Sequence, residues 1–210
     1  MGETTHSYSG EGLDESAVDL NPLNLFRGWL SDAKAAGIHL HEAMTLATAT
    51  ADGRPSARLV LLKQADERGF VFFTNYNSQK ARELDANPQA ALVFYWPQLE
   101  RQVRVEGRVE RIPAAESDAY FKTRPRESQL GAAASPQSEV VASREVLEQR
   151  LRELEQFYEG REVERPSHWG GYRVSPERIE FWKGRPGRLH DRILYQRQGD
   201  EDWTISRLAP

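Results

Sequence analysis

The sequence has no cysteine among its 210 residues. This absence excludes disulfide bonds, thiolate catalysis and iron–sulfur ligation, and it favours a reducing compartment such as the cytoplasm. No apolar run approaches the ~20 residues that a membrane-spanning helix needs, and the polar residues 1–12 do not have the pattern of a signal peptide. We therefore expect a cytoplasmic protein without a membrane partner.

A strong charge of one sign is also missing. The chain carries 28 basic and 32 acidic residues, so its formal net charge is -4, and no global field attracts nucleic acid or an anionic membrane. The sequence contains neither G-x-G-x-x-G nor G-x-x-x-x-G-K-[ST], so the two common nucleotide-binding loops are absent. Any site for an anion must therefore be local.

A metal site is not expected either. His39 and His41 flank Leu40, and an H-x-H pair can bind a metal ion. No cluster of further ligands accompanies the pair in the sequence, so we predict no metal.

Apolar residues follow the two-residue period of strands in most of the chain, with hairpin turns between the runs. No strand–helix–strand alternation recurs, which argues against a parallel nucleotide-binding sheet. We predict a mainly β fold with peripheral helices, built as a closed or partly closed antiparallel barrel. The expected strands are residues 44–50, 56–63, 70–74, 90–96, 101–111, 169–174, 178–183, 189–197 and 203–208, and the expected helices are 22–37, 79–86, 113–120 and 143–158.

The first twenty residues differ in composition from the rest. They are polar, acidic and rich in Gly, Ser and Thr, which is typical of a flexible tail. We expect residues 1–20 to form such a tail and residues 21–210 to form a single domain.

Two short stretches concentrate cations. Arg188, His190 and Arg192 alternate in a predicted hairpin over residues 179–192, so they would share one face of a strand. Arg124 and Arg126 precede a serine at a predicted helix boundary, where forked donors and free N–H groups suit a phosphate. A solvated strand face and a solvated basic loop remain the alternatives.

Separated motifs in one order carry a resemblance to a known family. They lie at residues 58–63, 73–75, 99–103, 120–129, 169–171 and 179–192, and the similarity runs from Pro22 to Pro210. The chain resembles the pyridoxamine/pyridoxine 5′-phosphate oxidases. This resemblance implies a homodimeric split antiparallel β-barrel that binds FMN at the subunit interface. It also implies oxidation of the phosphorylated vitamer to pyridoxal 5′-phosphate, with O2 reduced to hydrogen peroxide.

The resemblance also implies which residues bind FMN. Arg58 and Lys80 would contact the ribityl phosphate, and Gln137 and Ser138 would come from the partner subunit; cations, an amide and a hydroxyl suit a dianion. The family has Ser-Arg-Lys where this chain has Gln79 between Ser78 and Lys80, so weaker FMN retention is a hypothesis. The residues expected to line the flavin ring and the ribityl chain are Leu59, Val60, Leu61, Leu62, Lys63, Phe73, Thr74, Gln102, Trp182 and Arg192.

For the substrate, the resemblance implies a phosphate clamp at one end and two catalytic residues at the other. Arg188 and His190, with Leu189 between them, would lie over the pyridine ring, orient the reacting carbon and help to remove a proton. Hydride transfer needs close stacking of the two rings, so positioning is most of the catalysis. The clamp residues are Lys63, Tyr120, Arg124 and Ser128.

One departure lies near the amino terminus. Family members carry an Arg-x-x-Tyr segment that covers the bound substrate, whereas this chain has Thr5 and Tyr8 at those positions. The natural substrate could therefore be another flat aromatic metabolite, such as a dihydrophenazine precursor. A non-catalytic barrel that binds flavin or pyridoxal phosphate is a third hypothesis.

Overall fold

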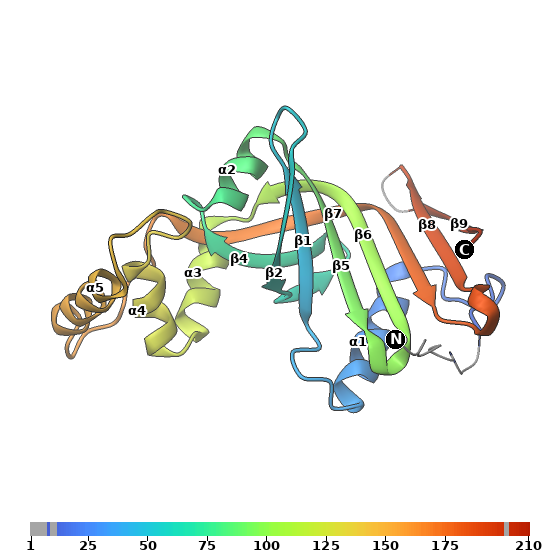
Figure 1. Ribbon diagram of the computed structural model, residues 1–210, viewed down its shortest axis with the longest axis horizontal. Coiled ribbons are helices and arrows are strands. Elements are labelled where there is room, and N and C mark those ends of the chain that lie inside the picture. The colour runs from blue at the N-terminus through green and yellow to red at the C-terminus, as the bar shows by residue number, and fades with distance from the viewer. Residues whose placement is uncertain (1–7, 9–11, 200–201) are drawn as a thin grey trace, which may run out of the picture.

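A computed structural model describes residues 8, 12–199 and 202–210. An antiparallel sheet of nine strands curls into a half-barrel, and five α-helices surround it in this described part of the chain (Figure 1). The main path is β2-β1-β5-β6-β7-β4-β3, while β8 pairs with β7 and β9 with β8. The predicted mainly β fold with peripheral helices is confirmed. The strands are β1 (Ala43–Ala49), β2 (Pro55–Leu61), β3 (Gln64–Asp66), β4 (Gly69–Asn75), β5 (Gln89–Trp96), β6 (Arg101–Arg111), β7 (Trp169–Lys183), β8 (Asp191–Gln198) and β9 (Asp202–Arg207).

Helix α1 (Pro22–Ala35) closes one end of the barrel. Asn21 caps it, since the Asn21 side chain accepts a hydrogen bond from the N–H of Leu23 at 2.9 Å. Phe26 is fully buried and meets the rings of Phe70 and Phe94 edge-on, each at 4.9 Å between centroids. This helix was predicted, because its apolar residues recur at helical spacing.

Strand β7 is longer than predicted. Residues 169–174 and 178–183 were expected as separate strands, but Trp169–Lys183 is one strand, which pairs with β4 along its first half and with β8 along its second. A register shift at Glu106/Gly107 of β6 accommodates Pro176. A Cβ on Gly107 would lie 2.0 Å from the carbonyl oxygen of Ser175, so the bulge requires glycine there.

The remaining helices lie around the other end of the barrel. Helix α2 (Gln79–Ala86) has the predicted bounds, and α3 (Ala114–Thr123) and α5 (Arg144–Phe157) nearly so. Helix α4 (Arg126–Ala134) was not predicted. The sequence predicted a helix boundary near Arg124 and no helix after it until residue 143. Pro125 is the N-cap of α4, a position at which its missing N–H donor costs no helical hydrogen bond.

The predicted strand from residue 189 was also wrong at its start. Residues Pro186–Arg188 form a 3₁₀ turn, in which Gly187 and Arg188 have φ angles of 68° and 62°. Strand β8 therefore begins only at Asp191, so Arg188, His190 and Arg192 do not share one strand face. A non-glycine residue in this left-handed region is strained, and such strain is concentrated at functional sites.

Part of the expected tail is described. Leu13 and Val18 pack against the core, and Arg207 holds Glu15 in an ion pair. Flexibility of residues 1–20 stays a prediction, and Thr5 lies outside the described residues. In the described part of the chain, no helix is both long and apolar enough to cross a membrane.

Candidate active site

A cleft of about 830 Å³ opens where β2 and β4 meet helices α2, α3 and α4. It gathers residues from six helices and strands, the sixth being β7 through Trp169, and most of the predicted phosphate and flavin residues are among them. The predicted residues that line it are Arg58, Leu59, Val60, Leu61, Lys63, Phe73, Thr74, Lys80, Tyr120, Arg124, Ser128 and Gln137.

The guanidinium of Arg124 lies in this cleft without a full set of partners. Its Nη1 atom is buried and has no hydrogen-bond partner among the described residues. The group lies over the ring of Trp169, 4.6 Å from the centroid, and burial lowers the pKa of Arg124 although the nearby Tyr120 opposes this shift. A buried N–H donor without an acceptor is costly, so the cleft is suited to an anion at this point.

Three nearly parallel aromatic rings stack beside Arg124. Phe73 stacks on Tyr120 with 4.0 Å between centroids and a 17° angle between planes, and on Trp169 at 5.2 Å and 11°. Burial raises the pKa of Tyr120, and the positive charge of Arg124 opposes this shift. Tyr120 therefore keeps its O–H proton at neutral pH and can donate a hydrogen bond to an anion.

Lys80 supplies a second cation at the other end of the cleft. Burial, and then the charge of Arg58, lower its pKa to about 8. Its Nζ atom lies 3.2 Å from Thr74 Oγ1 and 3.3 Å from Gln137 Oε1. Within the chain, Gln137 therefore contacts Lys80; its implied role toward FMN from the partner subunit stays a prediction.

Arg58 is held by a carboxylate that the sequence analysis missed. Its Nη2 atom lies 3.3 Å from Oε2 of the buried Glu83. Burial works to raise the pKa of Glu83, but hydrogen bonds from Ser56, Thr48 and Gln79 and the charge of Arg58 outweigh it and lower that pKa to about 2. Glu83 is therefore charged and orients Arg58. The sequence around Glu83 in helix α2 could not predict this role, because its hydrogen-bond donors Thr48 and Ser56 lie 35 and 27 residues earlier in the chain.

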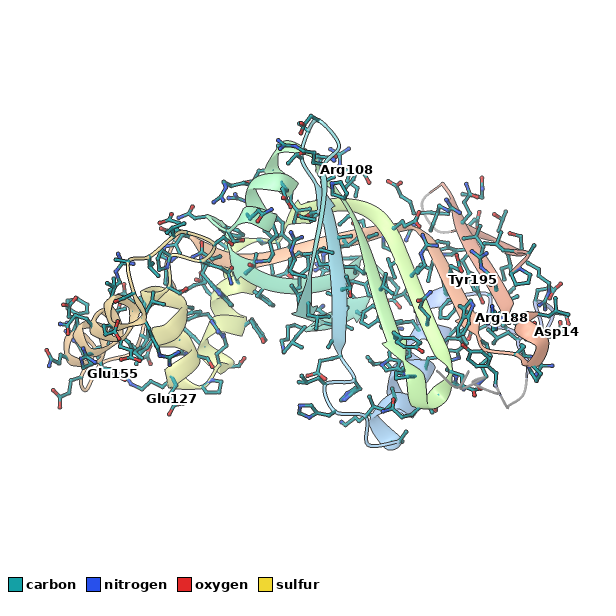
Figure 2. The ribbon with its side chains drawn as sticks, viewed as in Figure 1. Asp14, Arg108, Glu127, Glu155, Arg188 and Tyr195 are labelled. Atoms are coloured by element: carbon teal, nitrogen blue, oxygen red, sulfur yellow. The ribbon has the colours of Figure 1, made fainter. Side chains whose placement is uncertain are left out.

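The other predicted residues form a second group, around β7 and β8. The rings of Trp182 and His190 lie 4.7 Å apart, and Tyr8 meets His190 edge-on at 5.0 Å. Gln102 and Arg192 are the residues paired with Trp182 on the neighbouring strands β6 and β8. Figure 2 shows Arg188 at the opposite end of the molecule from Glu127, which lies in the first turn of α4, a helix that lines the cleft.

Hydrogen bonds fix both basic groups of this second group. The backbone N–H of Arg185 donates to Nδ1 of His190 at 3.1 Å, so neutral His190 carries its proton on Nε2. Arg192 donates to both carboxylate oxygens of the buried Glu180, at 2.8 and 3.0 Å. That pairing raises the pKa of Arg192, against the effect of burial.

Two family models match the chain. One, described as pyridoxamine 5′-phosphate oxidase, matches residues 30–158, and the other, described as the pyridoxine 5′-phosphate oxidase C-terminal dimerisation region, matches residues 169–210. The chain belongs to the pyridoxine/pyridoxamine 5′-phosphate oxidase family. The resemblance found in the sequence is thereby confirmed.

Relatives within this oxidase family are similar over nearly the whole chain. A pyridoxine/pyridoxamine 5′-phosphate oxidase of Trichormus variabilis is 60% identical over 97% of this chain and 95% of its own length. One of Rubrobacter xylanophilus is 61% identical over 97% and 93%.

Two solved structures of related proteins share the fold. PhzG from Burkholderia lata, in complex with tetrahydrophenazine-1-carboxylic acid, has a TM-score of 0.91 at 32% identity and covers 98% of this chain and 100% of its own. A pyridoxamine 5′-phosphate oxidase-related, FMN-binding protein of Nostoc punctiforme has a TM-score of 0.72 at 18% identity, covering 92% and 100%. The predicted split antiparallel β-barrel of the oxidase family is confirmed.

A few residues that the oxidase resemblance implied lie in the core or at the exposed edges of the two groups. Leu62 is 6% exposed and packs in the core. Ser138 is exposed with a φ angle of 72°, next to the cleft residue Gln137. Arg188 and Leu189 are exposed beside His190, and Leu189 is 74% exposed.

Some cleft residues were not predicted as site residues. Trp169 is the most informative, since it stacks on Phe73 and supports Arg124. The sequence did contain a signal for Trp169, namely the motif Trp169-Gly170-Gly171. Glycine is required at position 170, because a Cβ there would lie 2.1 Å from the hydroxyl of Tyr76. The other unpredicted lining residues are Asn75, Thr123, Pro125, Gly131, Ala132 and Ser135.

The described residues contain no group of three or more acidic or histidine side chains that could hold a metal ion.

Proposed function

We propose that this protein oxidises pyridoxamine 5′-phosphate and pyridoxine 5′-phosphate to pyridoxal 5′-phosphate, with O2 reduced to hydrogen peroxide. The observation that carries the proposal is the unpartnered, buried Nη1 of Arg124. It lies in one cleft with Lys63, Tyr120 and Ser128, a set of donors that suits a phosphate monoester. Membership of the oxidase family supports the same substrate class.

The residues of the cleft also fit FMN as the cofactor. Lys80 has a lowered pKa, which a bound phosphate would restore, and Arg58 is already oriented by Glu83. Strand β2 would lie along the ring and the ribityl chain, with Phe73 and Thr74 of β4 beside it. When bound, FMN supplies the hydride acceptor and returns the electrons to O2.

A homodimer would complete this site. Helices α3 and α4, which carry the clamp residues Tyr120 and Ser128, lie at the opposite end of the chain from β8 (Figure 1), so one chain alone does not bring phosphate clamp and catalytic residues together. A dimer with two-fold symmetry presents the same surfaces from both copies, and a second copy could place its Trp182, Arg188 and His190 over the first copy's cleft. The match of residues 169–210 to a dimerisation region supports this arrangement.

Within that arrangement, Arg188 and His190 orient the reacting carbon. Because Nδ1 of His190 accepts the Arg185 N–H, the proton on Nε2 can donate to the hydroxyl or amine of the vitamer. This tautomer favours orientation over proton removal for His190. The strained Arg188 lies two residues away and supplies a positive charge on the same turn. Glu180 fixes the guanidinium of Arg192, which would supply a positive charge to the ring of bound FMN.

One experiment tests the function. The purified protein is scanned for flavin absorbance, then mixed anaerobically with pyridoxamine 5′-phosphate, and finally exposed to air. We expect the flavin band to bleach, and air to restore it while peroxide forms. A yellow protein that neither bleaches nor forms peroxide with either vitamer would instead be a non-catalytic flavin-binding barrel.

A second candidate function rests on the similarity to PhzG. That protein was solved with tetrahydrophenazine-1-carboxylic acid, so a flat tricyclic acid is an alternative substrate for this chain. A tricyclic acid carries no phosphate, so this alternative does not explain why Lys63, Arg124 and Ser128 form a phosphate clamp. Comparing kcat/KM on pyridoxamine 5′-phosphate with kcat/KM on dihydrophenazine acids separates the two, and we expect the vitamer to be preferred.

A further inference from the structure

One arginine of the carboxyl-terminal strand β9 binds the amino-terminal segment through hydrogen bonds. Arg207, the last residue of β9, donates from Nη2 to the carbonyl oxygen of Leu13 at 2.7 Å and from Nε to Glu15 at 2.9 Å. Its Nη1 donates to Oδ1 of Asp191 at 2.6 Å. Glu15, through its hydrogen bond, and then Asp191 raise the pKa of Arg207, against the effect of burial. The guanidinium therefore joins the amino-terminal segment to the two neighbouring strands β8 and β9.

Asp191 binds the same segment from the other side. Its Oδ2 accepts the backbone N–H of Leu13 at 3.0 Å and lies 3.4 Å from Nε of Arg185. Asp191 directly follows His190, and Arg185 is the residue whose N–H fixes Nδ1 of His190. One carboxylate thus connects the amino-terminal segment to the turn that holds the proposed catalytic residues.

Tyr8 lies against the same turn. Its ring meets Trp182 at 5.8 Å and His190 at 5.0 Å, both edge-on. Gly184 leaves the space for this ring, since a Cβ there would lie 2.3 Å from Cδ1 of Tyr8. The site of contact is therefore shaped for an aromatic ring, and the held residues Leu13 and Glu15 follow Tyr8 closely in the chain.

We propose that Asp191 and Arg207 are positioning residues that anchor residues 12–15 and thereby place Tyr8 against His190 and Trp182 on the substrate side of the site. This inference rests on the proposed function. Neither residue touches the reacting atoms; each acts through Tyr8. Arginine is needed at position 207, because its fork reaches Leu13, Glu15 and Asp191 at once, which a lysine ammonium cannot do.

A double-mutant cycle tests the anchor. Arg207→Ala should raise the KM for pyridoxamine 5′-phosphate roughly fivefold with little change in kcat, because the proposed role of Arg207 is to place Tyr8. An effect that passes through Tyr8 makes the two residues energetically coupled. In a Tyr8→Ala background the same change should have almost no further effect, and Arg207→Lys should restore only part of the loss. An equal effect of Arg207→Ala in both backgrounds would show a general structural role and overturn the proposal.

Hydrogen exchange supplies a readout that needs no turnover. In the flavin-loaded protein, Arg207→Ala should speed exchange in the peptide that contains Leu13 by about tenfold, because local opening becomes easier. Arg27→Ala is the matched control, since Arg27 also pairs with a glutamate and is similarly exposed, at 41% against 39%. An unchanged exchange rate in Arg207→Ala would refute the anchor. If the exchange rate rises as expected but the unmodified protein does not turn over either vitamer, only the proposed function is refuted.

Discussion

The two ends of this molecule treat their cations differently. In the cleft, the described residues place no carboxylate in an ion pair with Arg124 or Lys80, and the pKa of each is lowered mainly by burial. Around β8, Arg192 is paired with Glu180, and Arg207 with Asp191. Cations buried without a carboxylate partner are costly unless an anion arrives, while cations paired with a carboxylate are fixed, as Arg58 in the cleft also is by Glu83. The first region is thus suited to bind phosphate, and the second to hold side chains in place.

The largest effect is expected in the second region. Arg188→Ala and His190→Ala should each lower kcat with pyridoxamine 5′-phosphate by about 100-fold, the lower end for a group that acts directly in proton chemistry or orientation. Steady-state kinetics on the flavin-loaded variants measures this. His39→Ala is the control, because His39 is exposed and far from both groups in the sequence. Full turnover with only weaker binding in both variants would remove the catalytic role.

In the cleft, removal of a phosphate donor should act on binding. Arg124→Ala should raise KM by roughly 10- to 100-fold, the value of a hydrogen bond to a charged group, with a smaller change in kcat. Arg126→Ala is the matched control, since Arg126 donates to the carbonyl oxygens of Tyr158 and Arg161 and does not line the cleft. A KM that is equal in the two variants would contradict the phosphate assignment.

Lys80 makes cofactor binding dependent on pH. Its pKa of about 8 in the free protein means that the ammonium is charged below that pH and loses its proton above it. The affinity for FMN should therefore fall as the pH rises from about 7 to about 9.5, by at most about tenfold per pH unit for one linked proton. Quenching of flavin fluorescence measures the affinity. The Lys80→Met variant should bind more weakly at low pH and show a nearly flat profile.

The smallest effect concerns the residue before Lys80. Gln79 donates to Oε1 of Glu83 at 2.8 Å, where the family carries a cation. Gln79→Arg should tighten FMN binding by about two- to fivefold, the range for an exposed ion pair. Gln149→Arg, on the remote helix α5, controls for net charge. An FMN dissociation constant that Gln79→Arg leaves unchanged would refute the hypothesis of weaker retention.

Local sequence signals predicted much of the fold. Asn21-Pro22 marked the start of α1, and Asn87-Pro88 marked the end of α2 within one residue. The helix boundary predicted around Arg124–Ser128 is real at Pro125, but a new helix, α4, follows directly, with Pro125 as its N-cap. The left-handed φ of Arg188 was not predictable, because strain at a single residue depends on the packing around it.

The site was predicted as a set of residues, but its arrangement was not. Motif residues such as Arg124 and Lys80 do share one cleft. The separation of this cleft from His190 follows from the path of β7 across the sheet, which depends on long-range pairing and leaves no local pattern. Likewise, the charge of Glu83 depends on Thr48 and Ser56, which reach it only in the folded chain.

Complementation between subunits tests most directly whether the two regions meet across a dimer. Arg124→Ala and His190→Ala chains are refolded together and assayed at a substrate concentration below KM. If two chains build each site, half of the dimers are mixed and carry one intact site, so activity should return to about a quarter of that of the unmodified protein. Activity that stays at the average of the two parent variants would show that each chain works alone and contradict the account.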